Sequence, residues 1–84
     1  MLISSGATIM SSRLPILKPR GLIRALNLLG FYKTRQNGSH AFFKHADGRT
    51  TTVPIHAGKD IDRGLLKGIL DEIGITKEEF EKYL

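Results

Sequence analysis

The chain has no cysteine among its 84 residues, and that absence excludes several kinds of structure and chemistry. It excludes disulfide bonds, thiolate zinc sites and cysteine nucleophiles. Long apolar runs are also missing, because no segment approaches the ~20 residues that a membrane-spanning helix needs. So short a chain forms one domain with a small core. We therefore expect a single cytoplasmic domain that does not enter a membrane.

The first residues lack the features of a secretion signal. Met1–Ser12 has no basic start, and serine and glycine interrupt its apolar stretches. We predict that residues 1–13 are a poorly ordered N-terminal extension. The remaining residues, 14–84, are expected to form the single domain.

Acidic residues are almost absent from the first 59 positions. These positions contain nine Lys and Arg residues and one acid, Asp47, which gives a net charge of +8. Residues 60–84 reverse the balance, with four bases against seven acids and a net charge of −3. A basic front half suggests a polyanionic partner. An ordinary solvated basic surface explains the charge about equally well.

Hydrophobic spacing predicts helices on both sides of a central β region. Apolar residues three and four positions apart indicate a helix over 20–29 and another over about 61–73. Asp60 or Asp62 can cap the second helix, and a capping box at 76–79 predicts a short third one.

The segment between the two longer helices is typical of an antiparallel meander. Gly30 ends the first helix as a left-handed residue. Asn37-Gly38 and Asp47-Gly48 predict two tight hairpin turns of the same type. The predicted strands cover residues 31–36, 39–46 and 49–53. The fold class is therefore α+β, with two layers and helices on one face of the sheet.

Strand alternation separates the side chains of the second strand into two sets. His40, Phe42 and Lys44 point one way, and the residues between them point the other. The set that contains Lys44 is the better candidate for the outer face, where Phe42 would be able to stack on an unpaired base. The alternative, that Phe42 packs beneath the first helix, is slightly favoured because aromatic residues so often serve as core.

The same alternation argues against a metal site. His40 and His45 are five residues apart, so a regular strand directs them to opposite faces. His56 has no carboxylate or second histidine at a familiar ligand spacing. We expect neither a metal nor another cofactor.

Acid–base chemistry on RNA is what remains, because the 2′-hydroxyl of RNA is a built-in nucleophile. Histidine can take and give a proton near neutral pH, and a cation can steady the charge on the phosphorane. We assign His40 as the base, Lys44 as the charge stabiliser and His56 as the best available acid. Lys33, Arg35 and Arg49 are the expected clamps on the RNA backbone. From the pattern alone, a hydrogen-bonded turn residue is the favoured interpretation of His40.

An ordered set of short motifs resembles the HicA mRNA-interferase toxin family. The motifs are Leu28–Phe31, Arg35–His40, Thr51–His56, Gly64–Leu70 and Ile73–Phe80, and together they span nearly the whole domain. The resemblance implies a fold like the double-stranded-RNA-binding domain. It implies a toxin of a type II toxin–antitoxin system, a ribosome-independent ribonuclease that cuts mRNA. The family's catalytic histidine lies in its Gly-Ser-His motif, which places it at His40 and puts Ser39 among the RNA-binding residues.

The same resemblance implies a HicB-like antitoxin that holds the toxin inactive in a hetero-oligomer. Two other functions stay open. One is a non-catalytic module that binds double-stranded RNA, which predicts salt-dependent binding without cleavage. The other is a basic docking surface for an acidic protein, which the toxin interpretation includes.

Overall fold

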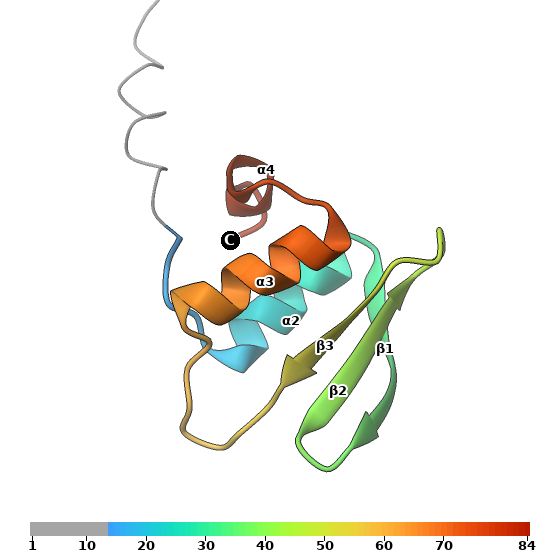
Figure 1. Cartoon of the computed structure of the whole chain (residues 1–84), viewed down its shortest axis with the longest axis vertical. Coiled ribbons are helices and arrows are strands. Elements are labelled where there is room, and N and C mark those ends of the chain that lie inside the picture. Colours follow the sequence, from blue (N-terminus) through green and yellow to red (C-terminus); the bar gives the residue numbers. More distant parts are fainter. Residues whose placement is uncertain (1–13) are drawn as a thin grey trace, which may run out of the picture.

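The computed structural model describes residues 14–84, and the extension predicted over 1–13 lies outside them. The elements are α2 (Pro19–Leu28), β1 (Phe31–Asn37), β2 (His40–His45), β3 (Thr50–Pro54), α3 (Arg63–Ile73) and α4 (Lys77–Glu81). The strands form one antiparallel sheet in the order β1-β2-β3. The helix α2 packs against β1 of this sheet and α3 packs against β3, with α4 beyond α3 (Figure 1). The predicted α+β architecture is confirmed.

The first helix forms where the apolar spacing predicts it and begins one residue earlier. Pro19 occupies its first turn, where the missing N–H has no partner to lose. Leu22, Ala25 and Leu26 are buried along one side. The chain then leaves the helix through Gly30, whose φ of +97° confirms the predicted left-handed ending.

Gly30 also lies tightly against a side chain of β2. A Cβ at this position would come within 2.8 Å of His45 Nε2. The His45 ring packs edge-on against Phe31, with 5.0 Å between the ring centroids. Its Nδ1 accepts a hydrogen bond from the backbone N–H of Asp47 at 3.0 Å. The ring is therefore held on both sides while it closes over Gly30.

Both hairpin turns lie at the predicted places, but their residues differ from the prediction. Asn37 pairs with His40, so the two residues of the first turn are Gly38-Ser39 and not Asn37-Gly38. Glycine supplies the positive φ, +61°, that the first turn position needs. The register therefore places Asn37 inside the sheet.

The second turn is longer than the predicted two residues. The N–H of His45 donates to the carbonyl of Arg49, and the N–H of Gly48 donates to the carbonyl of His45, both at 2.9 Å. This is a three-residue loop with Gly48 at φ +99° after the turn. Asp-Gly pairs fit such a loop as well as a two-residue turn, and sequence alone does not separate them.

The helices after the sheet begin at side-chain caps. Asp62 accepts the N–H of Leu65 at 2.8 Å, which confirms one of the two predicted caps and starts α3 at residue 63. Thr76 accepts the N–H of Glu79 at 3.1 Å and so begins α4. Between them, Gly74 ends α3 in the left-handed conformation.

The hydrophobic core lies between the sheet and the helices. The sheet contributes Phe31, Ala41, Phe43 and Val53, and the helices contribute Leu22, Ala25, Leu26, Leu66, Ile69, Leu70, Ile73 and Phe80. Burying one large apolar side chain contributes about 1.5–3 kcal/mol, which makes this layer the main source of stability. Since the inward strand positions face the helices, the alternate positions point away from them.

Candidate nucleic-acid interface

The outward-pointing side chains of the sheet form a surface that no element of residues 14–84 covers. Directly paired residues on neighbouring strands share a face. The register therefore arranges this open face in three rows, which are Tyr32–Lys44–Thr50, Arg35–Phe42–Thr52 and Asn37–His40–Pro54. None of these residues is acidic. The prediction that the Lys44 set points outward is confirmed, and the favoured placement of Phe42 beneath the first helix is wrong.

A β-bulge in β1 determines which cation joins this face. Lys33 pairs with Phe43 and Arg35 with Phe42, so Thr34 is the extra residue between the two pairs. The Thr34 hydroxyl donates to the Phe42 carbonyl at 3.3 Å. In a regular strand Arg35 would share the inward side with Phe31, because the two are an even number of residues apart. The bulge reverses that alternation and turns Arg35 outward.

Arg35 and Phe42 form a direct contact at the centre of the open face. The guanidinium carbon of Arg35 lies 4.2 Å from the centroid of the Phe42 ring. A cation over an aromatic face at this distance is attracted by the ring quadrupole. Phe42 is half-buried and Arg35 is exposed, so the guanidinium is held in place while its other surface faces solvent. The sequence predicted both residues but not their contact.

His40 lies at the start of β2, next to the turn that contains the Gly-Ser pair. Its neighbours across the sheet are Asn37 and Pro54, and its side chain is exposed. The N–H of Ile55 donates to the Ser39 carbonyl at 2.6 Å, which extends the pairing beyond Pro54. The backbone on both sides of His40 is therefore fixed. Ser39 itself is half-buried and contributes this carbonyl.

His56 and Lys44 lie on opposite sides of His40 along the sheet. His56 is exposed and comes two residues after Pro54, so it leaves the sheet at the His40 end. Lys44 is four residues from His40 on the same strand, which separates their backbones by about 13 Å. Lys44 and His40 are thus on one face, with the Arg35–Phe42 pair between them.

Tyr32 is a member of this face that the sequence interpretation did not single out. It pairs with Lys44 and is 61% exposed, the largest exposed fraction of any large hydrophobic residue in the described part of the chain. A signal for it existed, because a buried Phe31 at the start of the strand requires the next residue to point outward.

Two of the predicted clamps lie elsewhere. Lys33 is opposite Phe43, on the helix side of the sheet, and its Nζ donates to Gln36 at 2.9 Å. Arg49 is at the far hairpin, where Nη1 donates to the carbonyl of Ile73 at 2.6 Å. Lys33 is thus on the face opposite His40, and Arg49 is at the other end of the sheet.

Arg49 also neutralises the one acid of the basic half. Its Nε lies 2.8 Å from Asp47 Oδ2, and its backbone N–H donates to Oδ1 at 3.0 Å. That backbone hydrogen bond, followed by the guanidinium, lowers the pKa of Asp47 below its ordinary value. The carboxylate is therefore ionised and paired at the hairpin, at the end of the sheet away from His40.

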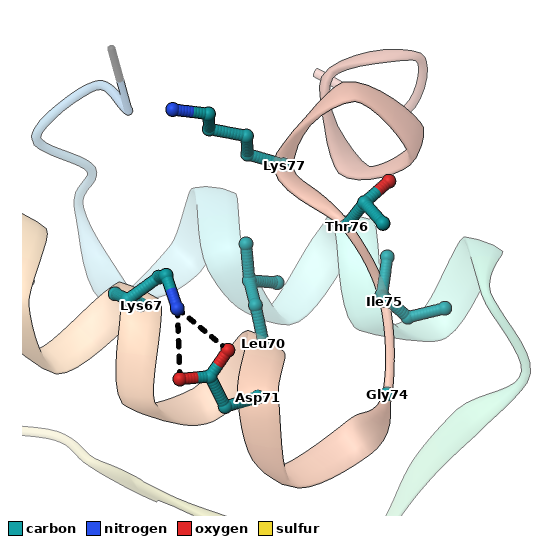
Figure 2. Close-up of a pocket in the computed structure, with 7 residues that line it drawn as sticks. All are labelled: Lys67, Leu70, Asp71, Gly74, Ile75, Thr76 and Lys77. Carbon is teal, nitrogen blue, oxygen red and sulfur yellow. Dashed lines mark hydrogen bonds and ion pairs between the residues drawn. The ribbon is translucent and has the colours of Figure 1, made fainter. Parts of the chain in front are cut away.

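A separate hollow of about 370 Å³ lies where α3 turns into α4. Leu70, Gly74 and Ile75 line it, and the Lys67 ammonium binds both oxygens of Asp71 at 2.7 and 2.9 Å (Figure 2). None of the predicted site residues is among its lining. The open face, and not this hollow, brings together the predicted residues His40, Phe42, Lys44 and Arg35.

The described residues show two further properties. No group of three or more His, Asp or Glu within 14–84 is arranged to hold a metal ion. No helix in the same range is long and apolar enough to cross a membrane.

Together, the fold and the site define a small α+β domain with helices on one side and an open, positively charged sheet face on the other. Residues 19–75 match the family described as the HicA toxin of bacterial toxin-antitoxin, so the chain belongs to the HicA toxin family. It is accordingly a toxin of a toxin–antitoxin system, with an antitoxin as its partner. No curated protein matches the chain.

Proposed function

We propose that this toxin is an endoribonuclease that cleaves mRNA by acid–base chemistry at His40. The observation that carries the proposal is the position of this histidine, exposed on a strand paired on both sides, at the end of a cationic face without acids. A base is useful there because RNA holds its own nucleophile beside each phosphate. One positioned acid–base group typically accelerates such a reaction by about 10²–10⁴.

In the proposed reaction, His40 takes the proton of a 2′-hydroxyl while that oxygen bonds to the adjacent phosphorus. The bond from phosphorus to the 5′-oxygen then breaks, and the leaving oxygen receives a proton from an acid. The products are a 2′,3′-cyclic phosphate and a free 5′-hydroxyl. His56 is our candidate for the acid because it leaves the sheet at the His40 end.

The geometry changes the expected role of the cations. Lys44 lies about 13 Å along the strand from His40, which suits a neighbouring phosphate better than the one under attack. Arg35 is one row from His40, and Phe42 holds its guanidinium. A planar guanidinium also matches a phosphate through paired hydrogen bonds. We therefore assign Arg35 to the phosphorane and Lys44 to the next phosphate.

The test is RNA cleavage by the purified toxin in EDTA. We expect the parent chain to release fragments with cyclic phosphate ends, and His40→Ala to lose at least a hundredfold in rate while keeping its circular dichroism spectrum. Lys67→Ala is a matched surface control because Lys67 lies on α3. Cleavage by His40→Ala at the parental rate would remove His40 from the chemistry. Salt-dependent duplex binding without cleavage would favour the non-catalytic module instead.

We propose further that a HicB-like antitoxin inhibits the toxin by covering the open face in a hetero-oligomer. This face holds His40 and the free cations, so a partner that covers it blocks cleavage and RNA binding together. Inhibition should therefore be accompanied by loss of RNA binding, and charge-reversing Lys44→Glu should weaken the complex more than Lys67→Glu. An antitoxin that inhibits cleavage while RNA stays bound would contradict this arrangement.

A further inference from the structure

Two aromatic side chains lie on the open face in adjacent rows. Phe42 is in the central row, and Tyr32 is in the row beyond it, opposite Lys44. Successive rows are two residues apart along β2, which is about 7 Å. An exposed tyrosine ring on a sheet, with a lysine as its direct neighbour, has no packing role in this domain, since the core lies on the other side.

The line from His40 through Phe42 to Tyr32 alternates between rings and cations. Arg35 lies against the first ring and Lys44 beside the second. Bases stack on aromatic rings and on guanidinium planes, and phosphates pair with the cations next to them. Sheets that carry aromatic residues in this way stack two or three bases. This face has room for a short unpaired segment and offers it both kinds of contact.

We propose that the open face binds a single-stranded segment of RNA, with Tyr32 as a base-stacking platform distant from the reacting phosphate. This inference rests on the proposed ribonuclease function and names the form of its substrate. One base stacks on the Arg35–Phe42 pair and a further base on Tyr32, while Lys44 binds the phosphate between them. A duplex does not fit this role, because its bases are already stacked on one another and their faces are hidden.

Tyr32 is therefore a specificity residue. It selects unpaired RNA over paired RNA and takes no part in proton transfer. Its hydroxyl is not needed for stacking, so a phenylalanine should replace it and an aliphatic residue should not. Valine keeps the preference for a strand while it removes the ring, which separates loss of stacking from loss of β1.

The experiment measures binding on a His40→Ala background, so that RNA stays intact whatever the chemistry. The probes are a short labelled single-stranded RNA and a duplex of the same sequence, followed by fluorescence anisotropy. Tyr32→Val should raise the dissociation constant for the single strand roughly five- to 150-fold, the range for loss of one stacked base. Tyr32→Phe should stay within about twofold of the parent by the same reasoning. The duplex should bind more weakly than the single strand when position 32 holds tyrosine or phenylalanine, and Tyr32→Val should leave the affinity for the duplex unchanged.

Leu28→Ala serves as the matched control, because Leu28 is 59% exposed on α2 and lies off the open face. Two results would overturn the inference. One is equal binding of the single strand by His40→Ala with and without Tyr32→Val. The other is a preference of His40→Ala for the duplex. If the parent cleaves RNA but Tyr32→Val binds normally, only the stacking platform fails. If Tyr32→Val weakens binding but the parent never cleaves, only the ribonuclease proposal fails.

Discussion

Replacing Gly30 by alanine tests the packing that joins the first helix to the sheet. Two costs arise. The first is conformational, because a φ of +97° disfavours any residue with a Cβ by about 1–2 kcal/mol. The second is steric, because the new Cβ would lie 2.8 Å from Nε2 and 2.9 Å from Cδ2 of His45. The ring must therefore move.

Moving the His45 ring costs two contacts. Its edge-on packing against Phe31 contributes about 0.5–1.5 kcal/mol. The hydrogen bond from the Asp47 N–H contributes about 0.5–1.5 kcal/mol more. We therefore expect Gly30→Ala to lower the free energy of unfolding by about 2–5 kcal/mol in total, measured by urea unfolding followed by circular dichroism.

Gly48→Ala is the matched control. Gly48 has nearly the same φ, +99°, but a Cβ there would meet no atom within 4 Å. This variant should lose only the conformational part, about 1–2 kcal/mol. The double variant Gly30→Ala with His45→Ala should show no steric cost beyond the loss of the ring. If the Gly30 and Gly48 variants lose the same stability within about 0.5 kcal/mol, the contact with His45 does not constrain position 30.

Two further substitutions test the cap of α3 and the hairpin between β2 and β3. Asp62→Ala removes the acceptor for the Leu65 N–H and should cost about 0.5–2 kcal/mol of stability in the same urea assay; no loss would show that α3 starts without its cap. For Asp47, the hydrogen bond from the Arg49 backbone lowers the folded-state pKa, so its stabilising effect is present above the ordinary value of 3.8 and is lost as pH falls through the folded-state pKa. Asp47→Asn should therefore be less stable than the parent near neutral pH and match it in strong acid, whereas a constant difference across a pH series would contradict this linkage.

The layers of the fold follow from the sequence because they depend on the spacing of apolar residues and on the turn and capping residues between elements. Leucines three and four positions apart indicate α2 and α3 wherever the exact bounds fall, and alternation along β2 correctly separates His40 from His45. The turn residues depend on the strand register, which local sequence does not determine. An Asn-Gly pair fits a two-residue turn in one register and Gly-Ser fits it in the next, so the structure was needed to place Asn37 within β1.

The site could be predicted only in part, because it depends on contacts between strands. Arg35 and Lys33 look equivalent in the sequence, since both are cations at odd positions of one strand. The extra residue at Thr34 sends them to opposite faces. Arg49 resembles a free cation until the fold brings it to Asp47 and to the end of α3. Neither the opposite faces of Lys33 and Arg35 nor the contacts of Arg49 can be read from the spacing of residues along the chain.

The bulge in β1 lies within an exposed segment that follows a single buried residue. Before it, Phe31 is part of the core, and after it no residue of the strand is buried. Substitutions at exposed positions usually change stability by no more than about 0.5 kcal/mol. Substitutions in the part of the strand that carries Arg35 should therefore cost little stability, whereas Phe31 holds the strand to the core. Variants of the open face can therefore be compared with the parent as folded proteins, because one buried side chain holds this strand to the core.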